Sequence, residues 1–309
     1  MKEKPIYKKL RRSYRSTWKY VLCLVPSTFL LILFIYYPRI AVLPMSLYKW
    51  SPMSSVKEFV GLHNFEILFT AKLDDTLQYL SNTLWYIGGL FVIQTVLAMI
   101  LALALQKQTR SNRFFRTYFF LPMVLSSTMI SLTWTFMYDP NLGIINNLLG
   151  AAGVDGFPGV NFFSENWRAI LLIVLVHIWA NMGYPIMILT SGLNTVSDDL
   201  GEAAKVDGAN SWQTFTKITF PLMLPTVFRL SLMTISTGAM SSDYVVMMGS
   251  RARGMSFDTW SAYMYKETMN SMDYGRVSAA SVLMFVILLI ASLIQFFAMR
   301  KVEKRILGD

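Results

Sequence analysis

Six long apolar segments divide this sequence, and they limit its possible folds more than any other feature does. A helix needs about 20 mostly apolar residues to cross the hydrocarbon core of a bilayer. Each segment reaches that length, and only helices or closed barrels satisfy their backbone polar groups inside a membrane. We therefore predict an all-α, polytopic membrane protein with six transmembrane helices, at about residues 20–47, 77–105, 117–137, 167–195, 220–246 and 277–299.

The composition argues against several other classes of protein. Charged residues make up 15% of the chain, against about 25% in a typical soluble domain. The net charge of +10 does not indicate nucleic-acid binding, because the basic residues gather at the ends of the apolar segments. The single cysteine, Cys23, excludes a disulfide within the chain. His63 and His177 are far apart, so we expect each to be a loop residue or a satisfied polar group on a helix, and we expect no metal and no cofactor.

The distribution of basic residues predicts the orientation in the membrane. Loops rich in Lys and Arg stay on the cytoplasmic side. The N-terminal segment 1–19, the loop 106–116 and the tail 300–309 are basic, whereas the loop 138–166 contains no Lys or Arg. These regions place both termini in the cytoplasm, on either side of a permease domain at residues 20–299.

One loop disagrees with this orientation. The loop 247–276 lies outside the cell in a six-span arrangement, yet it carries Arg251, Arg253, Lys266 and Arg276. The remaining basic regions agree with one another, so we keep six spans with both termini inside.

The connection between the fourth and fifth apolar segments is polar and predicted to be cytoplasmic. Ser197 can cap the start of a short helix, and Asp198 and Asp199 in its first turn suit the positive end of the helix dipole. The pair Asp207-Gly208 then predicts a turn.

A second helical stretch follows this turn. Residues 211–218 place Trp212, Phe215 and Ile218 at spacings of three, and we expect these side chains to be exposed. Pro221 is expected to begin the fifth span, because a missing backbone donor is tolerated in the first turn of a helix.

These residues, about 197–219, thus predict a helix–turn–helix that lies along the membrane surface. Taken alone, it could be a generic amphipathic connection. It could also be a docking surface, because Ala203 and Ala204 would let another protein approach closely.

The residues of this connection match a known pattern. Glu202-Ala203-Ala204, Asp207-Gly208-Ala209, Phe215, Ile218 and Pro221 resemble the "EAA" loop of binding-protein-dependent ABC importer permeases. Other segments are similar to the carbohydrate-type branch of that family, among them "FVGLHNF" from Phe59, "NTLWYIGGLFVIQTVLAMILALAL" from Asn82, "RFFRTYFFLPMVLS" from Arg113 and "DYGRVSAASVLMFVILLIASLIQ" from Asp273. The resemblance covers about residues 20–299.

The resemblance implies a multi-pass permease subunit of an ATP-driven importer in the bacterial cytoplasmic membrane. In that family the loop inserts into a cleft of a separate ATPase, whose closure switches the permease between outward- and inward-facing states. By matched position, the ATPase-coupling residues are Glu202, Ala203, Ala204, Asp207 and Gly208. The implied partners are a second, related permease in a heterodimer, an ATP-binding cassette ATPase dimer, an extracytoplasmic solute-binding protein, and a sugar or oligosaccharide as substrate. The chain has no Walker motif, so we do not expect it to be an enzyme.

Two departures from the family pattern stand out. The chain has Val196-Ser197 where the family often has Ile-Pro, so the first helix relies on a serine cap. The stretch "ISTGAMSSDYVVMMGSRARGM" from Ile235 lacks the Gly-Gly-Gly-Pro element often found after the fifth span.

Several polar and aromatic residues are candidates for the substrate path. Asp243 lies within or near the outer end of the fifth span. Placing a carboxylate inside a membrane costs free energy, so such a residue is a candidate for a function. It could bond a sugar hydroxyl, or pair with a partner permease or with Arg251 or Arg253. The remaining candidates combine aromatic faces with polar tips, although helix packing is an alternative for each, and they are Trp134, Tyr138, Trp179, Asn181 and Tyr184.

Two other functions stay open on the sequence alone. A permease of the same family for another solute, such as a glycerol-phosphate compound or a polyamine, would share the loop. An ion-coupled secondary transporter would work alone and would not need a docking loop.

Overall fold

The computed structural model describes residues 22–54, 56–249 and 257–307. The basic segment predicted at residues 1–19 lies outside the described residues. The chain forms two compact units, one of residues 1–67 and 272–283 and one of residues 68–271 and 284–309. Helices dominate both units, so the predicted all-α fold is confirmed.

The first unit contains the first apolar helix and a small hairpin. Leu22–Met45 is one continuous helical span. The Asn64 amide ties the following segment together, because it donates to the carbonyl oxygens of Ser46 at 2.8 Å and Tyr48 at 3.0 Å. In chain order, the elements of this unit are η1 (Ile32–Tyr36), α2 (Tyr37–Met45), the antiparallel pair β1 (Tyr48–Lys49) and β2 (Glu58–Phe59), and α3 (His63–Phe69), which ends at the start of the second unit.

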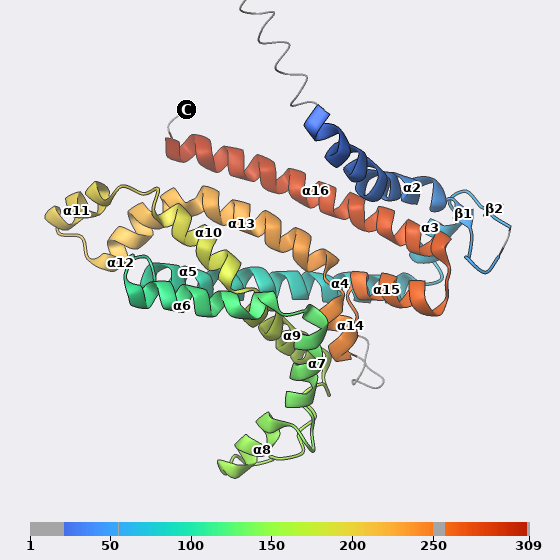
Figure 1. The fold of residues 1–309 in the computed structure, drawn as a ribbon, viewed down its shortest axis with the longest axis horizontal. Coiled ribbons are helices and arrows are strands. Elements are labelled where there is room, and N and C mark those ends of the chain that lie inside the picture. The colour runs from blue at the N-terminus through green and yellow to red at the C-terminus, as the bar shows by residue number, and fades with distance from the viewer. Residues whose placement is uncertain (1–21, 55, 250–256, 308–309) are drawn as a thin grey trace, which may run out of the picture. The chain divides into compact units, whose positions relative to one another are not determined.

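The second unit holds most of the helices; its α4 and α5 belong to one long helix, and α13 packs beside α4 (Figure 1). In chain order its elements are α4 (Leu73–Gly89), η2 (Leu90–Gln94), α5 (Thr95–Ala104), α6 (Arg110–Phe120), η3 (Leu121–Val124), α7 (Ser127–Met137), α8 (Ile144–Ala151), α9 (Asn166–Asn181), α10 (Gly183–Leu193), α11 (Asp198–Val206), α12 (Ser211–Thr214), η4 (Phe215–Thr219), α13 (Phe220–Met240), α14 (Asp243–Gly249), α15 (Trp260–Asn270) and the larger part of α16 (Tyr274–Leu307).

Four helices of the described chain are long and apolar enough to cross a membrane. They are Leu22–Met45, Leu73–Ala104, Ser211–Met240 and Tyr274–Val302. Two bent pairs bring the total to as many as six, if each pair is one span. The predicted six spans therefore agree with the structure only when these two spans are broken.

The third and fourth spans are the broken ones. Arg110–Val124 and Ser127–Met137 meet at 95°, and Asn166–Asn181 and Gly183–Leu193 meet at 61°. In the fourth span the break precedes Pro185, whose missing N–H and bulky ring disturb the helical bonding of the preceding turn. The sequence predicted one span at each of these places but not its bend, because apolar length does not report a change of direction.

The fifth helix differs from the prediction at both ends. It is continuous from Ser211 to Met240, so the second helix of the cytoplasmic connection is not separate from the span. Pro221 does not start the helix but follows the π-turn η4, where the N–H of Phe220 bonds to the carbonyl of Phe215. The π-turn changes the hydrogen-bond pattern from i→i−4 to i→i−5 just before Pro221, which has no N–H to donate. At the outer end the helix stops at Met240 rather than residue 246, since Ser241 is extended and α14 begins a new direction.

The break in the fourth span packs tightly against α6. A Cβ atom added at Gly183 would lie 3.0 Å from both the carbonyl oxygen of Phe119 and the Cα atom of Phe120. Small residues allow such close backbone approach between membrane helices, where packing rather than the hydrophobic effect holds helices together. Gly183 therefore fixes how closely α10 approaches α6.

We predict that Gly183→Ala lowers the free energy of unfolding by about 1–3 kcal/mol, because the added methyl group meets backbone atoms that must shift. The matched control is Gly88→Ala, since Gly88 is also helical and an added Cβ atom there meets nothing within 4 Å. Thermal melting of the detergent-purified protein measures both. Equal melting temperatures for the two variants would contradict the tight packing at Gly183.

Candidate functional site

Both helices of the predicted coupling connection are capped by their own side chains. The Ser197 hydroxyl accepts a hydrogen bond from the N–H of Asp199 at 3.3 Å, which confirms the predicted cap of α11. Asn210 and Gln213 exchange two bonds of 2.9 Å at the start of α12 and form a capping box. These caps let two very short stretches of polar sequence form defined helices.

The turn between these helices is a Schellman ending. The N–H groups of Gly208 and Ala209 donate to the carbonyls of Lys205 and Ala204, at 3.1 and 2.9 Å. Gly208 has a φ of +83°, which glycine adopts without the strain of a side chain. The predicted turn at Asp207-Gly208 is confirmed, and the positive φ explains why the motif has a glycine at position 208.

Four of the five predicted coupling residues lie on the surface of this turn. Glu202, Ala203, Asp207 and Gly208 are exposed, whereas Ala204 is 7% exposed. The expectation that Ala204 offers an approachable surface is therefore wrong for this chain. Its side chain lies on the covered side of α11, which contacts α12 and η4.

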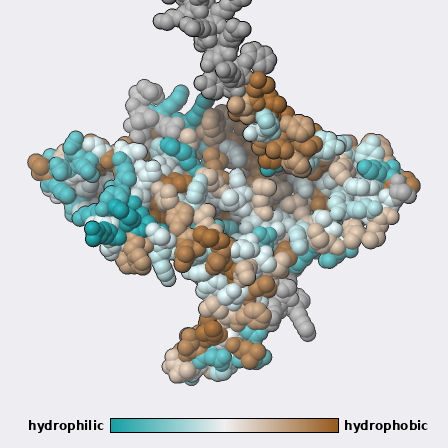
Figure 2. All heavy atoms as spheres, in the orientation of Figure 1, coloured by the Kyte–Doolittle hydropathy of each residue, from teal (hydrophilic) through white to brown (hydrophobic). Residues whose placement is uncertain are grey.

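The aromatic residues of the second helix also differ from expectation. Trp212 is 71% exposed, but Phe215 and Ile218 are half-buried. Both line a hollow of about 390 Å³ between this helix and α11, which Glu202 and Lys205 also line. The prediction that all three would be exposed was wrong, because the helix continues into α13 and packs against the core. Hydrophilic side chains gather over α11 and α12 (Figure 2).

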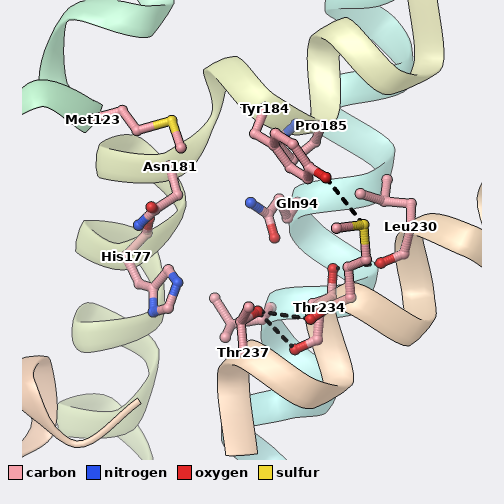
Figure 3. A pocket seen from close by; sticks show the side chains of 11 residues that line it. Gln94, Met123, His177, Asn181, Tyr184, Pro185, Leu230, Thr234 and Thr237 are labelled. Atoms are coloured by element: carbon pink, nitrogen blue, oxygen red, sulfur yellow. Dashed lines mark hydrogen bonds between the residues drawn. The ribbon is translucent and has the colours of Figure 1, made fainter. Parts of the chain in front are cut away.

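A second hollow lies at the break between α9 and α10 (Figure 3). Its volume is about 270 Å³, and α9 faces α13 across it. Among the described residues, no group of three or more His, Cys, Asp or Glu side chains could hold a metal ion. The polar side chains that line this cavity are Gln94, His177, Asn181, Tyr184, Thr234 and Thr237.

Two of the predicted substrate-path residues line this cavity. The amide of Asn181 donates to the hydroxyl of Tyr244 at 3.2 Å, and the hydroxyl of Tyr184 donates to the sulfur of Met233 at 3.1 Å. Amide and hydroxyl groups are the side chains that bond sugar hydroxyls, so the cavity can hold a polyhydroxylated solute.

The other aromatic candidates form a separate cluster. The rings of Trp134 and Trp179 have centroids 5.6 Å apart, and those of Trp134 and Tyr138 are 5.5 Å apart. None of the three lines the cavity at the helix break. The edge-to-face contact of Trp134 with Trp179 and the tilted contact with Tyr138 fit helix packing, the alternative that the sequence left open.

Asp243 lies outside the fifth helix and begins α14. Its carboxylate accepts a hydrogen bond of 2.7 Å from the Ser127 hydroxyl at the start of α7. It does not line the cavity at the helix break. Its suggested partners Arg251 and Arg253 lie outside the described residues, so their pairing stays a prediction.

A buried polar network supports the cavity wall. The Tyr86 hydroxyl and His177 Nδ1 are 2.6 Å apart, and the His177 ring lies 4.7 Å from that of Tyr244. His177 is thus a satisfied helix polar group, one of the two roles expected for it. Gln94, Thr234 and Thr237 were missed, although Gln94 is a strongly polar residue inside an apolar segment, and that signal could have found it.

The comparisons with known proteins agree with this architecture. The family model of the binding-protein-dependent transport system inner membrane component matches residues 94–308, which is well over half of the chain. The chain belongs to this family. It is therefore a membrane permease of an import system that depends on a binding protein.

Members of the family with similar sequences come from several bacteria. The chain is 34% identical to the probable ABC transporter permease protein YurN of Bacillus subtilis, over 91% of this chain and 97% of the relative. It is 27% identical to the multiple sugar-binding transport system permease protein MsmF of Streptococcus mutans, over 95% and 99%. It is 26% identical to the sn-glycerol-3-phosphate transport system permease protein UgpA of Escherichia coli, over 96% and 98%.

A solved structure shares the fold of this permease. A chain of a bacterial ABC transporter involved in the import of the acidic polysaccharide alginate superposes with a TM-score of 0.78. The match covers 95% of this chain and 99% of that one, at 22% sequence identity. Identity at this level supports the fold alone.

We predict that Tyr86→Phe lowers the free energy of unfolding by about 1–3 kcal/mol, because His177 then loses its buried hydrogen-bond partner. Tyr184→Phe is the matched control, since the Tyr184 hydroxyl bonds to a thioether, which is a weak acceptor. Thermal melting in detergent compares the two. If Tyr184→Phe destabilises the permease as much as Tyr86→Phe, the network does not support the cavity wall.

Proposed function

We propose that this permease imports a sugar or oligosaccharide across the bacterial cytoplasmic membrane, powered by ATP hydrolysis in a separate subunit. The observation that carries the proposal is the exposed turn formed by α11 and its Schellman ending. Its residues match the coupling loop of the family, and its backbone is fixed at both ends.

The saccharide class is supported by the relatives and by the cavity. MsmF is named for multiple sugar-binding transport, and the solved alginate importer carries a polysaccharide. The cavity at the helix break presents amide and hydroxyl groups beside apolar walls. This combination suits a sugar, whose hydroxyls need partners while its ring faces pack on apolar side chains.

The coupling role follows from which residues are accessible. We propose that Glu202, Ala203, Asp207 and Gly208 dock into the ATPase, and that Ala204 acts indirectly by packing α11 against α12. Closure of an ATPase pair would displace this turn. Because α12, η4 and α13 form one helix, the displacement would reach the cavity residues Thr234 and Thr237.

The proposed assembly contains further chains. A second, related permease would complete a heterodimer, an ATP-binding cassette dimer would supply hydrolysis, and an extracytoplasmic solute-binding protein would deliver the sugar. A solved alginate importer is in complex with a pentasaccharide-bound periplasmic protein, which supports the last of these partners. In this assembly the permease positions and moves the solute and performs no chemistry.

Reconstitution tests the function directly. The two permeases, the ATPase and the solute-binding protein encoded nearby are placed in proteoliposomes, and uptake of labelled saccharides is measured. We expect uptake to require ATP, ATPase and binding protein together. Uptake by this chain alone, driven by an ion gradient, would overturn the proposal and support a secondary transporter.

We predict that Ala203→Trp reduces ATP-driven uptake at least tenfold and weakens copurification of the ATPase, because a bulky exposed side chain blocks docking of α11. The matched control is Ala104→Trp, since Ala104 is also exposed but lies at the end of α5. Melting temperature checks that both variants fold. Normal uptake and ATPase attachment in Ala203→Trp would show that α11 does not couple the subunits.

A further inference from the structure

An exposed arginine lies inside the fifth span. Arg229 belongs to α13, within the continuous helix Ser211–Met240. At 1.5 Å per residue it is about 27 Å from Ser211 and about 17 Å from Met240. In the part of the chain that the structure describes, no hydrogen bond or ion pair holds its side chain. A cation at such a position is costly in lipid, so it faces water, a solute or another chain.

The neighbouring helix indicates how deep in the span Arg229 lies. Gln295 of α16 donates to the carbonyl oxygen of Phe228, the residue before Arg229, at 3.0 Å. Around Gln295 the exposed side chains of α16 include Leu293, Ile294 and Phe296, and the guanidinium group of Arg300 lies 4.7 Å from the centroid of the Phe296 ring. Arg229 therefore stands near the end of the apolar part of α16, at a level from which a long arginine side chain can extend to water on the cytoplasmic side.

The exposed face of α13 has a different composition from that of α16. Beyond Phe220 at its start, the exposed residues of α13 are Arg229, Met233, Ser236, Thr237 and Met240. Their spacing of four, three, one and three places them on one side of the helix. Branched aliphatic residues make up much of the exposed face of α16, whereas this face carries a cation, two hydroxyls and two flexible thioethers. Such a face suits a wetted pathway rather than lipid.

This face joins the cavity at the helix break. Met233 and Thr237 are exposed and also line the cavity, together with Asn181 and Tyr184. Arg229 lies one helical turn from Met233 and about two turns from Thr237, on the side toward α12 and the coupling turn. A solute that leaves the cavity along α13 toward the cytoplasm would pass its guanidinium group.

We propose that Arg229 binds an anionic group on the transported saccharide, so that the substrate is a sugar acid or sugar phosphate. A guanidinium group holds a carboxylate or a phosphate by two parallel charge-assisted hydrogen bonds. The hydroxyl and amide groups of the cavity bind the sugar ring. Arg229 binds the anionic group of the saccharide about one helical turn beyond Met233, on the side toward α12. This inference rests on the proposed import of a saccharide and names its chemical class.

The experiment uses the complete importer in proteoliposomes with three probes. They are an oligouronate, the same oligouronate with its carboxylates reduced to hydroxyls, and a sugar phosphate. ATP-dependent uptake of each probe is measured for the wild type, Arg229→Gln and Arg229→Lys. Arg113→Gln is the matched control, because Arg113 is an exposed arginine of α6 that does not line the cavity.

We expect the wild type to import an anionic probe, and Arg229→Gln to reduce that uptake roughly tenfold or more, in line with the loss of a hydrogen bond to a charged group. Arg229→Lys should give an intermediate loss, and Arg113→Gln none. The oligouronate and the sugar phosphate distinguish a carboxylate from a phosphate as the recognised group.

Three results would overturn the inference. The first is uptake of the reduced, neutral probe alone, at the same rate in the wild type and in Arg229→Gln. This result would keep the proposed importer function but would show that the substrate is not an anionic saccharide. Loss of the second permease on purification of Arg229→Gln would show that Arg229 pairs within the assembly. ATP-independent uptake, or no uptake of any saccharide, would instead contradict the proposed function itself.

Discussion

Inside a membrane, every backbone N–H and C=O group needs a partner within the protein, and the broken fourth span is where this chain meets that demand with side chains. Pro185 cannot donate to the carbonyl of Asn181, and one turn earlier the side-chain amide of Asn181 donates to the His177 carbonyl at 3.0 Å. His177 in turn is held by Tyr86, and Asn181 by Tyr244. The polar network thus lies directly beside the helix break, and its residues His177 and Asn181 also line the cavity.

Local features were predictable from the sequence because local chemistry determines them. Ser197 caps α11 and Gly208 ends it, and both follow from residue types at fixed offsets. The number of apolar segments followed from length alone. The direction of those segments did not, because apolar length gives neither the place nor the angle of the 95° and 61° bends, although Pro185 lies just after the second of them.

The candidate site shows the same division. Glu202 and Ala203 were placed on an exposed turn from the sequence, and Asn181 and Tyr184 were named among possible path residues before the cavity was known. Ala204 was misplaced because a three-residue pattern does not say which side of a short helix is covered. Arg229 was missed although a charge inside an apolar segment is the same kind of signal as Gln94, but only the structure shows the exposed face to which it belongs.

The continuous helix from Ser211 to Met240 has a thermodynamic consequence. It joins the proposed coupling turn to the cavity wall as one helix, with the π-turn η4 and Pro225 inside it, so movement of one end is transmitted to the other. In such a body, any free energy by which ATPase binding alters solute affinity must equal that by which solute alters ATPase binding. If the proposed ATPase docks on this turn, binding of a solute in the cavity would therefore change the affinity of the permease for the ATPase by the same factor.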